Sequence, residues 1–123
     1  MPRGLALPLL WTLLIAVLSA IPLPERGPEI PRLLDVGHVA SYALLAALWI
    51  RSLGARWEAL LPPLATVPLT EVIQLPLPWR DATVLDLVNN LVGVAFGAAA
   101  YLTVSTLTQR RGSSRRRSSR RAP

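Results

Sequence analysis

Hydrophobic residues gather into four long runs along the chain, separated by short polar or proline-rich connections. A hydrocarbon core of about 30 Å requires roughly 20 predominantly apolar residues in a helix, and each run comes close to that length. The last three runs carry polar residues near their ends, but the middle of each is mostly apolar. The pattern predicts an all-α membrane protein, a bundle of four transmembrane helices over Leu5–Leu23, Leu34–Leu53, Trp57–Leu75 and Leu85–Leu107.

The basic residues indicate how this bundle is oriented. Arg3 precedes the first run, Arg51 and Arg56 flank the connection between the second and third, and an Arg-rich tail follows the fourth. The other two connections mix acidic and basic residues. Because Lys and Arg in short loops favour the cytoplasmic side, we expect both termini in the cytoplasm and a multi-pass location in the cell membrane.

The amino-acid composition is also typical of a membrane protein. Of 123 residues, 52% are hydrophobic and 16% are charged, which is too apolar for an ordinary soluble domain. The formal charge of +6 comes from the tail, since seven Arg fall within residues 110–123 and the remainder is near −1. The absence of cysteine excludes disulfides, thiolate catalysis and thiolate metal sites.

The composition shift near residue 110 predicts two parts. Residues 1–109 would form the four-helix domain, and residues 110–123, RRGSSRRRSSRRAP, a disordered basic cytoplasmic tail. We expect this tail to set topology and to contact anionic lipid headgroups. Nucleic acid is not an expected partner, because the tail has no aromatic residue to stack on a base.

The first run has an alternative interpretation as a signal peptide, with Arg3 before an apolar segment and the small pair Ser19-Ala20 at its end. Leu18 is a poor residue for the cleavage signal at this point. The sequence therefore favours an uncleaved helix, and the rest of the topology holds in either case.

Polar residues converge at the predicted outer ends of three helices. Within each helix they recur at spacings of three, four or seven residues, which places them on one face. A charged side chain costs on the order of 2.5–3.5 kcal/mol at the centre of a span, so these groups should face inward, with Arg80 as the natural partner of the carboxylates. The predicted ligand-binding cluster is Asp35, His38, Tyr42, Glu71, Gln74, Arg80, Asp86 and Asn90.

Several of these residues also have a purely structural interpretation. Asp86 and Asn90 could merely cap and begin the fourth helix, with Asp81 or Thr83 as the cap itself. Gly93 and Gly97 form a G-x-x-x-G pattern that is typical of close helix packing. Aromatic residues at the helix ends are typical of interfacial anchors; they are Trp11, Tyr42, Trp49, Trp57 and Trp79.

Two blocks of this pattern resemble the VanZ-like family of small bacterial membrane proteins. They are DVGHVASY, residues 35–42, and EVIQLPLPWRDATVLDLVNNLVGVAFG, residues 71–97. The resemblance covers about the last three spans in residue type, order and spacing. It implies a link to resistance against glycopeptides such as teicoplanin, which act at the outer face of the cell membrane.

Three functions remain open at this stage. The first is binding of an anionic lipid headgroup, an envelope precursor or a glycopeptide. The second is an enzyme acting on a lipid-linked substrate, with His38 or Glu71 as general base, which the lack of a recognisable nucleophile disfavours. The third is a scaffold in which the polar residues only stabilise the bundle. A single histidine argues against a zinc site, no cofactor is expected, and a homo-oligomer is compatible with the glycine pattern.

Overall fold

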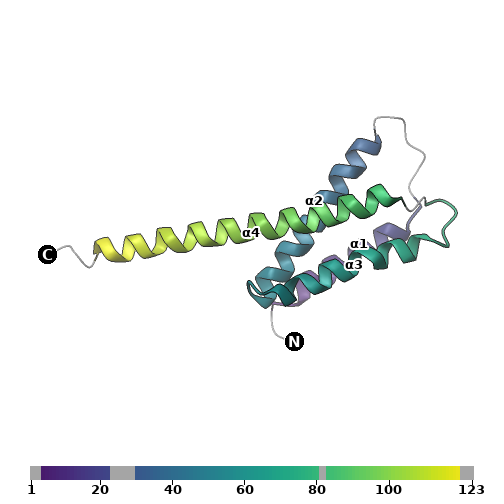
Figure 1. Cartoon of the computed structure of the whole chain (residues 1–123). Coiled ribbons are helices and arrows are strands. Elements are labelled where there is room, and N and C mark those ends of the chain that lie inside the picture. The colour runs from purple at the N-terminus through teal and green to yellow at the C-terminus, as the bar shows by residue number, and fades with distance from the viewer. Residues whose placement is uncertain (1–3, 23–29, 81–82, 120–123) are drawn as a thin grey trace.

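A computed structural model describes residues 4–22, 30–80 and 83–119, without the side chains of residues 30–35 and 115–119. Within these ranges all regular secondary structure is helical (Figure 1). Its elements are α1 (Ala6–Ala20), α2 (Ile30–Leu53), the 3-10 helix η1 (Trp57–Leu60), α3 (Leu61–Gln74) and α4 (Val84–Ser119).

Prolines set the limits of α1 and α3. Ile21 precedes Pro22 and has extended backbone angles, φ −73° and ψ 134°, because a residue before proline disfavours the α conformation. α1 therefore ends at Ala20. Pro62 and Pro63 occupy the first turn of α3, where a missing N–H costs no intrahelical bond.

Two of the four expected spans reach the length and apolarity of a membrane-crossing helix: Val36–Leu53 within α2 and Val84–Ser114 within α4. α1 has 15 residues and α3 has 14, so both are shorter than the predicted runs. The difference has a backbone cause, since Pro22 ends α1 early and the four residues before α3 adopt the tighter η1 turn. The apolar pattern alone does not contain this information.

The C-terminal segment differs from the prediction. A disordered tail was expected from residue 110, whereas α4 continues to Ser119 and is 36 residues long, which corresponds to about 54 Å. Extending an existing helix needs no new nucleus, and Arg is a good helix former. The hydroxyls of Ser113 and Ser114 donate to the carbonyls of Arg110 and Arg111. Residues 120–123 lie outside the described part.

α2 and α4 run in the same direction and cross in close contact (Figure 1). Gly93 and Gly97 make this contact possible. A Cβ atom at Gly93 would lie 2.6 Å from the Val39 carbonyl oxygen, and one at Gly97 would lie 2.5 Å from Cα of Ala43. The G-x-x-x-G pattern is thus occupied within the chain and holds α4 against α2.

α1 is joined to the other helices by hydrogen bonds along its length. Trp11 Nε1 donates to the Ser41 carbonyl oxygen at 3.0 Å. Trp49 Nε1 donates to Thr12 Oγ1 at 3.3 Å, and Ser52 Oγ donates to the Gly4 carbonyl oxygen. These contacts place the beginning of α1 beside the end of α2 and surround a small core formed by Ile15, Tyr42, Leu45, Ala46, Trp49, Val67 and Val94.

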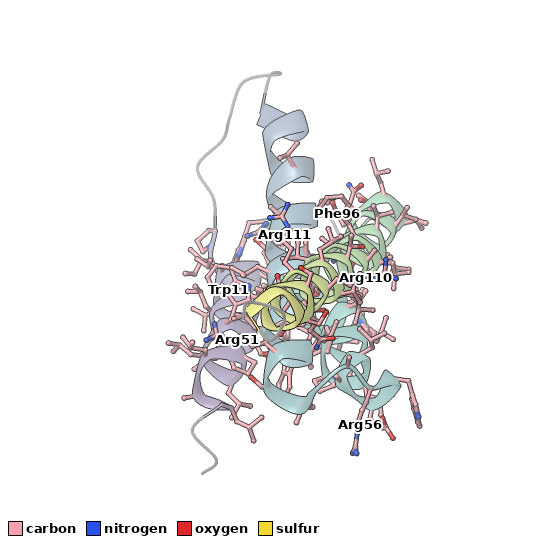
Figure 2. The ribbon with its side chains drawn as sticks, turned by 90° about the vertical axis from the view of Figure 1, so that its left-hand side faces the viewer. Trp11, Arg51, Arg56, Phe96, Arg110 and Arg111 are labelled. Atoms are coloured by element: carbon pink, nitrogen blue, oxygen red, sulfur yellow. The ribbon has the colours of Figure 1, made fainter. Side chains whose placement is uncertain are left out.

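Helix ends alternate between the two ends of the bundle. The beginnings of α1 and α3 and the end of α2 share the end toward which α4 projects (Figure 1). Viewed from that side, Figure 2 shows Arg51 in the last turn of α2, Arg56 in the connection after α2, and Arg110 and Arg111 on α4. The turn between α3 and α4 lies at the opposite end, beside the end of α1, as the hydrogen bonds of Trp79 and Arg80 show.

Candidate functional site

The inner face of α3 is a polar stripe. Thr66, Thr70 and Gln74 follow at i, i+4 and i+8, which is one side of a helix, and their side chains are 2%, 3% and 7% exposed. Glu71 flanks this stripe and is half-buried. The sequence pattern had grouped Glu71 with Gln74 as the inward pair, but the two threonines occupy the more buried positions.

Tyr42 on α2 meets this stripe directly. Its hydroxyl lies 2.8 Å from Thr70 Oγ1, and either oxygen can donate. Tyr42 is 2% exposed, so this hydrogen bond is buried in the core. Thr70 was not among the predicted site residues; its spacing of four residues from both Thr66 and Gln74 is the signal that could have found it.

Three residues from the end of α3 and the turn after it bind the end of α1, and we call them the α1 clamp: Gln74, Trp79 and Arg80. Gln74 and Arg80 belong to the predicted cluster, and Trp79 directly precedes Arg80. Arg80 donates through Nη2 to the carbonyl oxygens of Leu18, at 2.8 Å, and Ile21, at 3.1 Å. Trp79 Nε1 donates to the Ala20 carbonyl oxygen at 3.2 Å. Gln74 Nε2 reaches the Ser19 carbonyl oxygen at 3.5 Å.

The described partners of the Arg80 guanidinium are backbone carbonyls, whereas carboxylates were expected from the sequence. The last carbonyls of a helix have no intrahelical partner and carry partial negative charge, so a cation that reaches them binds without needing a carboxylate. Pro22 stops α1 at this point and leaves these carbonyls to be satisfied. The sequence contained both residues, but not their proximity across about 60 positions of the chain.

Asp86 has a clear local role at the beginning of α4. Thr83 is the residue before the helix, and its N–H and hydroxyl donate to Asp86 Oδ2 at 3.4 and 2.8 Å. The Asp86 N–H donates in return to Thr83 Oγ1 at 3.2 Å. This reciprocal arrangement is a capping box, so Thr83 is the cap that the structural interpretation had proposed as one of two candidates.

The remaining predicted residues with described side chains lie on three helices, and we call them the three-helix cluster: His38, Tyr42, Glu71, Asp86 and Asn90. Glu71 of α3 is close enough to interact electrostatically with Asp86 of α4 and with His38 and Tyr42 of α2. The side chains of His38, Glu71 and Asp86 are half-buried. These interactions of Glu71 link α3 with α4 and α2.

Asn90 is the most enclosed residue of the cluster. It is 2% exposed, and its side-chain oxygen Oδ1 is buried with no hydrogen-bond partner among the described residues. Asn90 follows Asp86 by one helical turn, which places the two residues on the same face of α4. Gly93, one turn later, contacts Val39 and Tyr42, which puts Asn90 near the level of His38 on the parallel helix α2.

The eight predicted ligand-binding residues thus divide into groups. Gln74 and Arg80 belong to the α1 clamp, five residues form the three-helix cluster, and the side chain of Asp35 lies outside the described residues. Within the described ranges, no three His, Asp or Glu side chains are placed to hold a metal ion.

Comparisons with protein-family models, with curated proteins and with solved structures found no match to this chain.

Proposed function

We propose that this chain is a four-span membrane protein, with both termini in the cytoplasm, whose three-helix cluster binds the polar headgroup of a lipid or a lipid-linked envelope component from the outer leaflet. The main observation that supports this proposal is the cluster itself. Half-buried ionisable groups, His38, Glu71 and Asp86, lie on three helices, and Asn90, one turn after Asp86 on α4, has a buried acceptor, Oδ1, with no partner in the described part of the chain. Polar groups inside a membrane protein that face one another commonly mark a binding site.

The exposure of the helices supports the membrane location. Core helices of soluble proteins are mostly buried, whereas only 28% of Val36–Leu53 and 17% of an apolar 18-residue stretch within Val84–Ser114 are buried. α1 is also covered with exposed apolar side chains, which a hydrocarbon environment would accommodate. Its exposed residues include Leu7, Leu10, Leu13, Val17 and Leu18.

Four spans are supported by the way the shorter helices pack. α1 lies against α3 and α2, and η1 with α3 gives a helical stretch of 18 residues, residues 57–74. A helix shorter than the hydrocarbon core is accommodated by local thinning of the bilayer at modest cost. The alternating helix ends and the Arg residues at one end support cytoplasmic termini.

The topology can be tested cleanly because the chain contains no cysteine. We expect a single cysteine at Pro78, in the α3–α4 turn, to react with a membrane-impermeant maleimide in intact cells. Cysteines at Ala55 or Ser113 should react only after the membrane is opened. Labelling of Ala55 and Pro78 from the same side would contradict the four-span arrangement.

Binding can be tested by native mass spectrometry of the protein extracted with its lipids. We expect retained polar lipid or envelope precursor in the parent protein, and loss of this species in Glu71→Gln and Asn90→Leu. Thr103→Ala is the matched control, since Thr103 is exposed on α4 away from the cluster. Equal retention in all variants would overturn the proposal.

A link to glycopeptide resistance is the narrower form of this proposal. It is supported by the resemblance of residues 35–42 and 71–97 to the VanZ-like family, and by an outer site of the kind that such antibiotics reach. The expectation of an anionic headgroup needs revision, because the Arg80 guanidinium that was to hold it binds the carbonyls of α1.

A further inference from the structure

We infer that the last turns of α4, residues 110–119, form a basic arm that binds the anionic headgroups of phospholipids. The arm lies at the end of the bundle opposite the three-helix cluster (Figure 1). This inference goes beyond the proposed function, because it assigns a second surface and a different class of lipid. It depends on the membrane location of α4 and not on the ligand of the cluster.

The basic arm carries charge of one sign. Five of its ten residues are arginine, at positions 110, 111, 115, 116 and 117, and residues 87–123 contain no Asp or Glu. The side chains of Arg110 and Arg111 are exposed. Charge complementarity therefore favours an anionic partner.

The neighbouring surface of the bundle has the same sign. Arg51 and Arg56 are exposed at the end toward which α4 projects, as Figure 2 shows. Residues 51–60 contain one carboxylate, that of Glu58, beside these two arginines. The bundle thus repels the arm more than it attracts it, and an anionic partner has to come from outside the chain.

The residues before the arm place it at the membrane surface. Residues 87–109 contain no charged side chain, and residues 87–108 form a helix of about 33 Å, close to the hydrocarbon core of about 30 Å. Hydroxyls in the last turns of this stretch donate to carbonyl oxygens of α4 itself at 2.8–3.0 Å, which makes them compatible with hydrocarbon. They belong to Thr103, Ser105, Thr106 and Thr108. Arg110 is then the first charged residue to reach the headgroups.

The helical form keeps the arginines near that surface. α4 continues through the arm to Ser119. Position 117 lies about 10 Å along the helix axis from position 110, whereas an extended chain would span about 24 Å. The Debye length at physiological ionic strength is about 8 Å, so the helix holds all five arginines within or close to the range of the surface potential. Successive positions are about 100° apart, which distributes the five around the whole circumference. Binding should therefore depend on charge density rather than on headgroup shape.

A phospholipid surface is favoured over nucleic acid as the anionic partner. The arm directly continues a helix whose apolar side chains are exposed before it, among them Val104 and Leu107. A polybasic segment that follows a membrane-spanning helix is typical of binding to anionic lipids. No aromatic residue follows Tyr101, so the arm has no side chain to stack on a base.

The inference can be tested with phosphatidylcholine nanodiscs doped with phosphatidylglycerol, with phosphatidylserine or with neither. Lipid retained on the protein is counted by native mass spectrometry at low and at high ionic strength. At low ionic strength we expect enrichment of both anionic lipids over phosphatidylcholine by about tenfold or more, because two or more arginines reach the headgroups. High ionic strength should abolish the enrichment, since salt screens exposed charges.

Replacing the five arginines by glutamine should abolish the enrichment, because glutamine removes the charge and keeps the helix propensity. The variant is Arg110→Gln, Arg111→Gln, Arg115→Gln, Arg116→Gln and Arg117→Gln. Lysine at the same five positions is the matched control, since it keeps the charge and should keep the enrichment. Glu71→Gln and Asn90→Leu should also leave it unchanged, which separates the arm from the proposed outer site.

Two results would overturn the inference and leave the proposed function standing. One is a protein with no preference for anionic lipid, or with a preference that persists in the glutamine variant. The other is arm-dependent binding of a single-stranded oligonucleotide to the protein in undoped discs, without enrichment of anionic lipid in the doped ones, which would assign the arm to nucleic acid.

Discussion

The α1 clamp and the three-helix cluster lie at the same end of the bundle but satisfy their polar groups differently. In the clamp, Arg80 and Trp79 donate to carbonyls at the end of α1 at distances of 2.8–3.2 Å. In the cluster, Glu71 and Asp86 are half-buried, and Asn90 Oδ1 is buried without a partner in the described part of the chain. The clamp is held by hydrogen bonds of the Arg80 Nη2 and Trp79 Nε1 groups, although Arg80 Nε is buried without a partner among the described residues. The cluster instead contains an acceptor without a described partner, Asn90 Oδ1.

This difference separates polar groups that stabilise the fold from polar groups that are expected to bind a ligand. Hydrogen bonds that are complete within the protein should contribute to the free energy of unfolding, and their removal should lower it. Groups held near like charge or without a partner cost stability, so their replacement should be neutral or favourable to folding while impairing binding. Stability and binding measured on the same variants therefore distinguish the two regions.

The largest expected effect comes from the seam that holds the cluster together. Gly97→Ala would push a methyl group into the backbone of Ala43, and we expect a loss of about 3 kcal/mol in unfolding free energy, measured by denaturation in detergent. Gly112→Ala is the control, because its Cβ would meet nothing within 4 Å. Gly112→Ala should be neutral or stabilising by up to about 1 kcal/mol; equal effects of the two substitutions would contradict close α2–α4 packing.

Arg80→Ala tests the clamp. Removal of the guanidinium leaves the carbonyls of Leu18 and Ile21 without its donors, and we expect a loss of about 2 kcal/mol in unfolding free energy. Arg51→Ala is the matched control, since Arg51 is exposed at the other end of the bundle. If Arg80→Ala abolished lipid retention and left unfolding unchanged, Arg80 would belong to the binding site rather than to the clamp.

Thr83→Ala tests the capping box of α4. Loss of the Thr83 hydroxyl removes two of the three hydrogen bonds shared with Asp86, and a missing cap costs about 1 kcal/mol. Thr103→Ala serves for comparison, because Thr103 lies inside the same helix and alanine favours helix there. Thermal unfolding of both variants gives the difference, and a Thr83→Ala protein as stable as Thr103→Ala would argue against the cap.

The sequence predicted local features better than long-range ones. The apolar runs predicted an all-helical chain, and the spacing of Gly93 and Gly97 predicted a close helix contact, because both depend on residues within a few turns. The partner of Arg80 could not be predicted, since the ends of α1 and the α3–α4 turn are about 60 residues apart. The early end of α1 depends on Pro22, whose effect an apolar count does not register.

Within the predicted site, the sequence indicated which residues are polar and share a helix face better than it indicated the role of each residue. Asn90 was included for its polarity and spacing. Its exposure of only 2% and the lack of a described hydrogen-bond partner for its Oδ1 depend on the packing of α4 against α2. Thr70 was missed because threonine is common on helix faces and becomes distinctive only when Tyr42 is seen to contact it. Tertiary packing decides both cases.

Asn90→Leu is the most direct test of the central claim that the three-helix cluster is a binding site. Leucine has a similar size and removes a buried acceptor that has no partner among the described residues. We therefore expect an unfolding free energy within about 0.5 kcal/mol of the parent or above it, together with loss of the retained polar lipid in native mass spectrometry. A protein that was destabilised by about 2 kcal/mol or more, with lipid retention unchanged, would show that Asn90 holds the bundle together and would contradict the account.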